Sequence, residues 1–344
     1  MKKFCVFCGN PPENKNMEHV IPQWLSKYTE RFNEECHQKT VTDAKIRFRN
    51  LKFPACTKCN DAFGKLESAT KPILLSIMEG KPVSGEQINI LLDWFDKIRV
   101  GIWLLELILA KKVDEINPGF HIADRMGQKD RLLMVERVEG NPKGLAYAGT
   151  GTELFYNTPT AIQLIVNDFI FTNASEHGLV SARMGFPCRQ KMPIRDGFQP
   201  IEVEVMPGRN KTSHPVVMSQ GATPFKTLIY QPIYRNCCNI PPEENPYNCE
   251  YVRNHSYDPD NGVGGIFFQR TNNQIHYLDA HETVNLTPKA QPKKNFDTII
   301  RNVFKLQNYM MENLYTMKDT DPKLAQYIQK QILLNKIYAG EKLR

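Results

Sequence analysis

Four of the nine cysteines in this chain of 344 residues form two C-x-x-C pairs, a spacing typical of metal ligands. Cys5 and Cys8 make the first pair, and Cys56 and Cys59 make the second. Four thiolates in two such pairs provide a closed tetrahedral site, which is the pattern of a structural Zn²⁺ ion. A redox function is the alternative, but thioredoxin-type motifs occur singly and beside a βαβ unit. The spacing therefore predicts structural zinc.

An acidic residue and a histidine, Glu18 and His19, lie between the two cysteine pairs in the stretch MEHVIP, and Asn60 directly follows the last cysteine. These residues also have simple structural explanations. Glu18 and His19 could be a surface pair at the end of a strand, and Asn60 could be a helix N-cap. Histidine has a pKa near ~6.5, which suits it to take a proton from water at neutral pH. A purely structural zinc site needs none of these residues, so their joint position indicates a catalytic site.

The order of these elements resembles that of the HNH, or ββα-metal, endonucleases. The segments CVFC, EHVIP and RNLKFPACTKCN follow the family's order, in the variant that has asparagine in place of the last histidine. The resemblance covers residues 5–67, about a fifth of the chain. The chain departs from the common pattern by having glutamate rather than aspartate at position 18, and by an insertion over residues 23–44. The resemblance implies a metal-dependent enzyme that hydrolyses phosphodiester bonds in DNA, with a role in restriction or antiphage defence.

The same resemblance implies a role for each candidate residue. His19 would be the general base that activates water, and Asn50 would orient its ring. Glu18 and Asn60 would supply oxygen ligands to one catalytic Mg²⁺ or Mn²⁺ ion. Glu67, further along the following helix, is an additional candidate ligand.

Two other functions stay open at this point. A zinc-stapled protein could bind nucleic acid without cutting it, although binding alone does not need an imidazole beside an acid. The chain could also be an RNase. The resemblance favours double-stranded DNA as the partner. A cut through both strands needs two sites, so a homodimer or a second encounter with the DNA is a further expectation. Residues 81–290 could serve target choice, sensing or the binding of a regulatory protein partner.

The charge distribution is compatible with a nucleic-acid partner. The formal net charge is +7, and residues 1–70 contain twelve Lys and Arg residues against eight Asp and Glu residues. Lys45, Arg47 and Arg49 alternate with apolar residues and would share one face of a strand. That face could contact phosphate groups, or its charges could simply keep an exposed strand soluble.

The hydrophobic pattern predicts an α+β fold with three parts. Residues 1–80 are expected to form a zinc-stapled ββα-metal module, with strands at Met17–Ile21 and Lys45–Asn50 and a helix after Cys59. A cluster of Gly, Pro and Ser at residues 80–85 marks its boundary.

A larger mixed α/β domain is expected over residues 81–290, and a C-terminal helical hairpin over residues 291–344. Apolar residues at three- and four-residue spacing predict a core helix over residues 86–112. Runs rich in β-branched and aromatic residues follow from Leu132 to Glu204 and predict a sheet. A second zinc site is not expected, because vicinal cysteines rarely bind one ion together; the residues considered are Cys237, Cys238, Cys249 and His255.

The composition is that of a globular protein, with 41% hydrophobic, 24% charged and 10% aromatic residues. The first ten residues contain two lysines but no apolar stretch typical of a secretory signal. The most hydrophobic run, VGIWLLELILA, is too short to span a bilayer. We therefore expect a cytoplasmic protein without a membrane partner.

Overall fold

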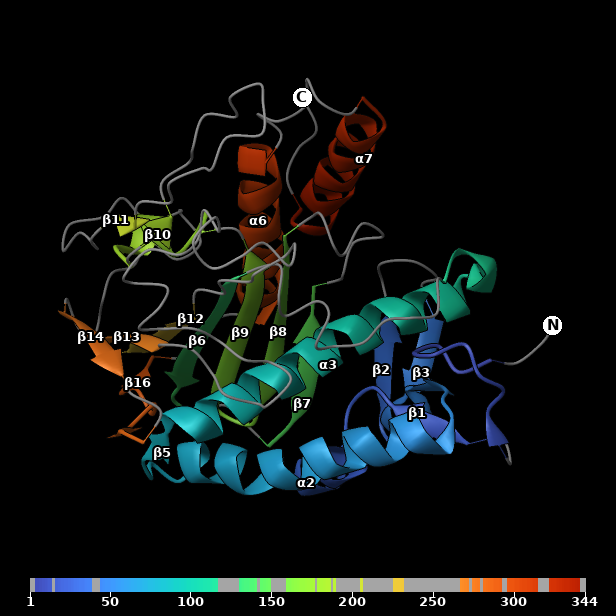
Figure 1. Ribbon diagram of the computed structural model, residues 1–344, viewed down its shortest axis with the longest axis horizontal. Helices are drawn as coiled ribbons and strands as arrows, with labels where there is room; N and C mark the ends of the chain where they lie inside the picture. The colour runs from blue at the N-terminus through green and yellow to red at the C-terminus, as the bar shows by residue number, and fades with distance from the viewer. Residues whose placement is uncertain are drawn as a thin grey trace, which may run out of the picture.

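Helices and strands are mixed along the described part of the chain, which confirms the predicted α+β class (Figure 1). No helix among the described residues is both long and apolar enough to cross a membrane. The cysteines and histidine considered for a second zinc site, between residues 237 and 255, lie outside that part. This computed structural model describes residues 4–13, 16–38, 44–116, 130–140, 143–149, 159–176, 178–186, 188–189, 205–206, 225–231, 267–271, 274–278, 281–292, 296–314 and 322–340.

Two short strands and a long helix lie around the cysteine pairs. Strand β1 (Met17–His19) pairs antiparallel with β4 (Lys52–Pro54). Helix α2 (Thr57–Met78) begins directly after Cys56, three residues earlier than the helix predicted after Cys59. It continues through Pro72 to its end. Apart from the residues between β1 and β4, these elements follow the order strand, strand, helix.

The residues between β1 and β4 form a small unit of their own. It contains helix α1 (Gln23–Tyr28), strand β2 (Glu35–Gln38), strand β3 (Ala44–Arg47) and the 3₁₀ turn η2 (Phe48–Asn50). β2 and β3 pair antiparallel. The strand predicted over Lys45–Asn50 is therefore shorter than expected, because the chain turns after Arg47 to enter β4.

Helix α3 (Gly85–Leu109) confirms the core helix predicted over residues 86–112. Its start is fixed by a capping box: the Gln87 N–H donates to Ser84 Oγ at 3.2 Å, and the Ser84 N–H donates to Gln87 Oε1 at 2.9 Å. Gly80 adopts a φ of 77° in the turn that joins α2 to α3. The two helices then run side by side (Figure 1).

An eight-stranded sheet forms the centre of the larger part, in the order β14-β13-β12-β6-β9-β8-β7, with β16 pairing alongside β6. Every pairing is antiparallel except that of β16 with β6. The strands are β6 (Asp130–Val138), β7 (Leu145–Ala148), β8 (Thr160–Val166), β9 (Phe169–Glu176), β12 (Lys226–Gln231), β13 (Phe267–Thr271), β14 (Gln274–Leu278) and β16 (Ala290–Gln291). Two short strand pairs lie outside this sheet: β5 (Val83–Ser84) pairs with β15 (Thr283–Val284), and β10 (Cys188–Arg189) pairs with β11 (Val205–Met206). The remaining elements are the 3₁₀ turns η3 (Val113–Glu115) and η4 (Ala182–Met184).

Helices cover both faces of this sheet. Successive residues of β6 alternate between two apolar clusters, with Leu133 on the α3 side and Leu132 on the other. On that other side lies α6 (Phe296–Leu314), and α7 (Pro322–Tyr338) packs against α6 (Figure 1). The two C-terminal helices thus occur as predicted.

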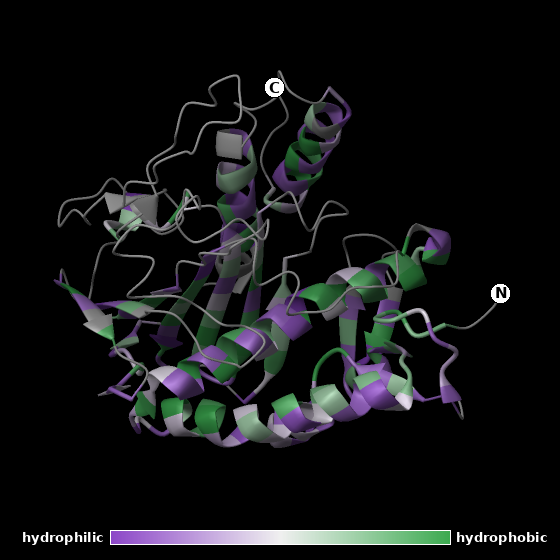
Figure 2. Cartoon of the chain, in the orientation of Figure 1, coloured by the Kyte–Doolittle hydropathy of each residue, from purple (hydrophilic) through white to green (hydrophobic). Residues whose placement is uncertain are grey.

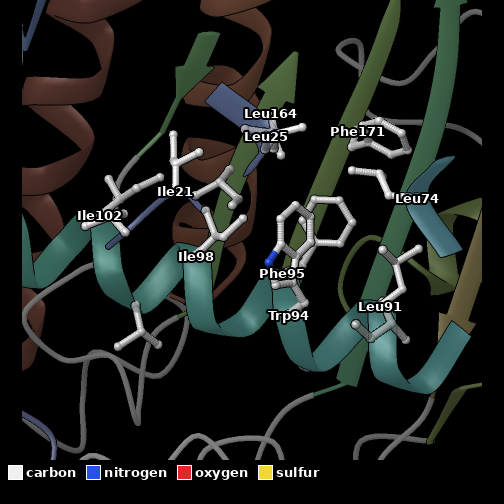
Figure 3. Packing of buried hydrophobic residues seen from close by; sticks show 14 of the residues in the cluster. Ile21, Leu25, Leu74, Leu91, Trp94, Phe95, Ile98, Ile102, Leu164 and Phe171 are labelled. Carbon is white, nitrogen blue, oxygen red and sulfur yellow. The ribbon is translucent and has the colours of Figure 1, made fainter. Parts of the chain in front are cut away.

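A single apolar cluster joins the N-terminal residues to the sheet. Figure 3 shows Ile21, Leu25 and Leu164 on one side of α3 near Ile98, and Phe171 of the sheet further along the helix, by Leu74. Figure 2 shows apolar and polar residues interleaved along α2 and α3. Helix α2 buries one face, whereas every residue of α3 from Trp94 to Leu107 is buried. Residues 1–80 therefore share their core with the rest of the protein. The domain boundary expected at residues 80–85 stays a prediction.

A substitution at Gly101 would test how closely α3 packs against the β1–β4 pair. A Cβ atom at this position would lie 3.2 Å from Val20 Cγ1 and 3.5 Å from Phe53 Cε1. We expect Gly101→Leu to lower the free energy of unfolding by about 1–3 kcal/mol, because overpacking would push these elements apart. Urea denaturation followed by circular dichroism would measure it.

The matched control is Gly64→Ala on α2, where nothing lies within 4 Å of the added Cβ atom. We expect this change to raise the free energy of unfolding by about 0.5–1 kcal/mol, because alanine loses less conformational entropy in a helix. Equal effects at the two positions would contradict the close packing at Gly101.

Candidate functional site

The four cysteines predicted to bind zinc come together. The Sγ atoms of Cys5, Cys8, Cys56 and Cys59 all lie within 4.8 Å of one another, and those of Cys8 and Cys56 are 3.5 Å apart. Zn–S bonds of about 2.3 Å in a tetrahedron separate the sulfur atoms by roughly 3.8 Å. The cluster can therefore bind one metal ion, and its chemistry is compatible with zinc. Among the described residues it is the one group of three or more His, Cys, Asp or Glu side chains placed to do so.

Local backbone structure places the first cysteine pair against β4. The Gly9 N–H donates to the Cys5 carbonyl at 2.9 Å, in a tight turn where Gly9 adopts a φ of 80°. The Val6 N–H donates to the Pro54 carbonyl at 3.1 Å and ties this turn to β4. Burial raises the pKa of the Cys5 and Cys59 thiols. A zinc ion must therefore displace protons, so its affinity falls in acid.

The register of β1 and β4 places Glu18 and His19 on opposite faces of the strand pair. His19 lies opposite Lys52, and Glu18 lies opposite Phe53. Opposed side chains share a face, whereas successive side chains alternate. Lys52 is exposed and His19 is half-buried, but Glu18 and Phe53 are buried. His19 therefore faces the solvent beside an ammonium group, and Glu18 faces the core.

Two polar contacts hold the His19 ring. The Gln23 amide nitrogen lies 3.2 Å from His19 Nε2, and the ring also makes a hydrogen bond to the Arg49 backbone. An amide N–H donates and a carbonyl accepts, so these partners fit a ring that is protonated at Nδ1 and has its lone pair at Nε2. Burial, followed by the charges of Lys52 and Lys97, lowers the pKa of His19 from its ordinary 6.5. The ring is therefore neutral at physiological pH, as a general base must be.

The two candidate asparagines lie in different elements, Asn50 in η2 and Asn60 in α2. Asn50 is exposed at the end of η2, and the hydrogen bond from this turn to His19 comes from the backbone of Arg49. Asn60 lies in the first turn of α2, where its Nδ2 donates to Asn16 Oδ1 at 3.0 Å. That bond fastens α2 to the residue before β1. The side-chain oxygen of Asn60 is then the atom that could bind a metal ion.

Glu18 forms a buried ion pair with Lys97 of α3. The distance from Lys97 Nζ to Glu18 Oε1 is 2.6 Å, and that to Glu67 Oε1 of α2 is 2.7 Å. Burial raises the pKa of Glu18 to about 6, against the opposing charge of Lys97. Burial by itself would lower the pKa of Lys97, but the charges of Glu18 and Glu67 reverse this and raise it. Lys97 is therefore charged, and it joins three elements that are far apart in the sequence.

This arrangement gives no support for a catalytic Mg²⁺ or Mn²⁺ ion at Glu18. Such an ion usually keeps several water molecules and binds through one or two carboxylates. Glu18 is only 4% exposed, and one of its oxygens is bound to Lys97. Glu18 and Asn60 also have different partners, Lys97 and Asn16. The two predicted ligands therefore do not fit a hydrated divalent ion in the arrangement seen here.

Lys97 is a site residue that the sequence analysis did not single out, because it lies in a helix assigned to the core by its apolar spacing. A signal was present in the sequence. The segment DWFDKIR places Asp93, Asp96, Lys97 and Arg99 in the middle of an otherwise apolar helix. Charged residues in a buried helix must be paired, and such a cluster predicts buried partners on neighbouring elements.

Comparisons with known proteins return no match. No family model matches the sequence, no curated protein matches it significantly, and no solved structure does so either.

Zinc content tests the cysteine cluster. We expect about one zinc ion per chain in the purified protein, and a loss of most of it in Cys59→Ser, because a structural site needs all four thiolates. The melting temperature of the whole protein should fall as well, since Cys5 and Cys56 belong to the apolar cluster that includes α3 and the sheet. Elemental analysis and a thermal scan would measure both.

The matched control is Cys36→Ser. Cys36 is a half-buried thiol outside the cluster, and its Sγ donates to the Ile46 carbonyl at 3.2 Å. This variant should keep its zinc. Full zinc content in Cys59→Ser, or none in the unaltered protein, would contradict the assignment.

Proposed function

We propose that this protein is an HNH-type, or ββα-metal, endonuclease that hydrolyses phosphodiester bonds in DNA. The observation that carries the proposal is the setting of His19. Its imidazole is neutral and half-buried, two polar contacts hold it, and Lys52 lies directly across the strand pair. The strand–strand–helix order around it, with a cysteine cluster at its base, agrees with the family resemblance.

In the proposed reaction, a water molecule takes the place of the Gln23 amide at His19 Nε2. The Nε2 atom takes a proton from this water while the water oxygen attacks the phosphorus atom. The bond to the leaving sugar oxygen then breaks. The Lys52 ammonium group, on the same face, would attract the phosphate and stabilise its growing negative charge. The Mg²⁺ or Mn²⁺ ion that the resemblance implies would supply further charge stabilisation if it bound. Its predicted ligands, Glu18 and Asn60, do not fit it in the arrangement seen here, so no step depends on it. Asn50 as a residue that orients His19 stays a prediction.

Exposed basic residues that follow His19 in the inserted unit support a nucleic-acid substrate, and the choice of double-stranded DNA rests on the resemblance. Lys45 and Arg47 are exposed on β3, and Arg49 is exposed in η2. Such residues contact phosphate groups without reading the bases, so binding should weaken as salt rises. A role in restriction or antiphage defence, and a homodimer or a regulatory protein partner, are proposals that rest on the resemblance.

The first test is plasmid cleavage by His19→Ala. Incubation of supercoiled plasmid with the unaltered protein and Mg²⁺ or Mn²⁺ should produce nicked circles. We expect His19→Ala to slow nicking by about 10²–10⁴-fold, which is the usual contribution of a general base. Gel electrophoresis over a time course would measure the rate.

His281→Ala is the matched control, because the side chain of His281 is 85% exposed and contacts Glu86 far from the strand pair. It should nick plasmid at the rate of the unaltered protein. Undiminished nicking by His19→Ala would reject His19 as the base. Plasmid binding without nicking by the unaltered protein would favour the non-catalytic alternative, and preferential loss of RNA in a parallel assay would favour an RNase.

The pH dependence of nicking provides a second test. The base works in its neutral form, so activity should fall as the pH drops through the pKa of His19. Burial and nearby positive charge lower this pKa, which places the acidic limb of the profile below pH 6.5. Lys52→Gln removes one of the charges, so we expect its acidic limb to move to higher pH and its nicking rate to fall.

Lys289→Gln is the control for this experiment, since Lys289 is an exposed lysine outside the site. Its acidic limb should coincide with that of the unaltered protein. A limb that does not move in Lys52→Gln would show that Lys52 has no electrostatic effect on the base.

A further inference from the structure

Oxygen atoms surround the ammonium group of Lys97. Its Nζ lies 2.6 Å from Glu18 Oε1 and 2.7 Å from Glu67 Oε1. It also donates to the carbonyl oxygens of His19, at 2.5 Å, and Val20, at 3.4 Å. The side chain of Lys97 has no solvent exposure. Two carboxylates and two successive backbone carbonyls thus converge on one buried cation.

This set of oxygens has the chemistry of a site for a hard divalent cation. Ca²⁺, for example, binds carboxylate and carbonyl oxygens at about 2.3–2.6 Å. In this protein the three N–H donors of an ammonium group satisfy the same kind of oxygens. A second cation cannot enter beside it, because two positive charges a few ångströms apart repel strongly where water is excluded.

We propose that Lys97 takes the place of a divalent cation at Glu18. Its ammonium group holds the His19 backbone from α3, and Glu18 acts through Lys97 rather than as a metal ligand. The two carboxylates would take a divalent ion only when the ammonium group is absent. This proposal concerns cation binding and does not depend on what His19 hydrolyses.

Manganese binding tests the proposal on the full, zinc-loaded chain. Electron paramagnetic resonance counts free Mn²⁺ during a titration of the unaltered protein, Glu67→Gln, Lys97→Met and Lys97→Met/Glu67→Gln. The unaltered protein and Glu67→Gln should bind the same amount of Mn²⁺, because no ion uses this carboxylate. Lys97→Met should bind about one additional Mn²⁺ ion per chain through the vacated oxygens, and the double variant should lose it.

Thermal unfolding gives a second measurement on the same proteins. Lys97→Met leaves the buried Glu18 carboxylate and the partly buried Glu67 carboxylate without a counter-ion, so its melting temperature should fall. Millimolar Mn²⁺ should restore most of that shift in Lys97→Met and none in the double variant, because an ion that binds only the folded state stabilises it. Lys289→Met, at an exposed lysine, is the matched control and should behave like the unaltered protein in both measurements.

A Mn²⁺ ion that the unaltered protein binds and Glu67→Gln loses would overturn the proposal, because the ammonium group would not then exclude the ion. A folded Lys97→Met that gains no Mn²⁺ would overturn it too. If Lys97→Met does not fold, the comparison of the unaltered protein with Glu67→Gln decides. Plasmid nicking is measured separately, so an inactive protein counts against the proposed function alone.

Discussion

The buried charge of Lys97 is the constraint on which the candidate site depends. An ammonium group away from water is costly unless protein oxygens replace its hydration shell. Lys97 meets this requirement with Glu18 of β1, Glu67 of α2 and the carbonyl of His19. Three elements must therefore keep a fixed separation, because a shift of any one would leave a charge unpaired inside the protein. The position of the His19 backbone follows from this contact.

Helix α3 carries a second group of buried polar contacts on its sheet side. Arg131 of β6 lies 2.5 Å from Asp93 and 2.7 Å from Asn89, and Arg99 donates to Asn173 of β9. Apolar packing alone tolerates small shifts, whereas hydrogen bonds fix distance and direction. Polar contacts on both sides thus fix α3 between the sheet and β1. This physical link explains why the N-terminal residues share one core with the larger part of the chain.

The cysteine cluster and the ion pair hold different parts of the same strand pair. The cysteines lie before β1 and at the junction of β4 with α2, so a bound metal would fix the ends of the pair. The ion pair fixes its buried face through Glu18. The opposite face is left for His19 and Lys52, whose side chains are partly or fully exposed. A neutral imidazole beside a positive charge is suited to accept a proton next to an anionic substrate.

The sequence by itself determined the cysteine cluster, the α+β class, the core helix and the C-terminal helix pair, because these depend on ligand spacing and on local periodicity. It also singled out His19. It did not determine what faces each candidate residue. The two-residue period of β1 turns Glu18 inward, where the partner comes from α3, nearly eighty residues away. It did not predict the role of the Arg49 backbone, which a turn supplies, or that of Lys97. Only the tertiary structure decided those partners, because a buried charge is paired through space. The segment DWFDKIR indicates that Lys97 needs partners, but the local pattern does not say which residues they are.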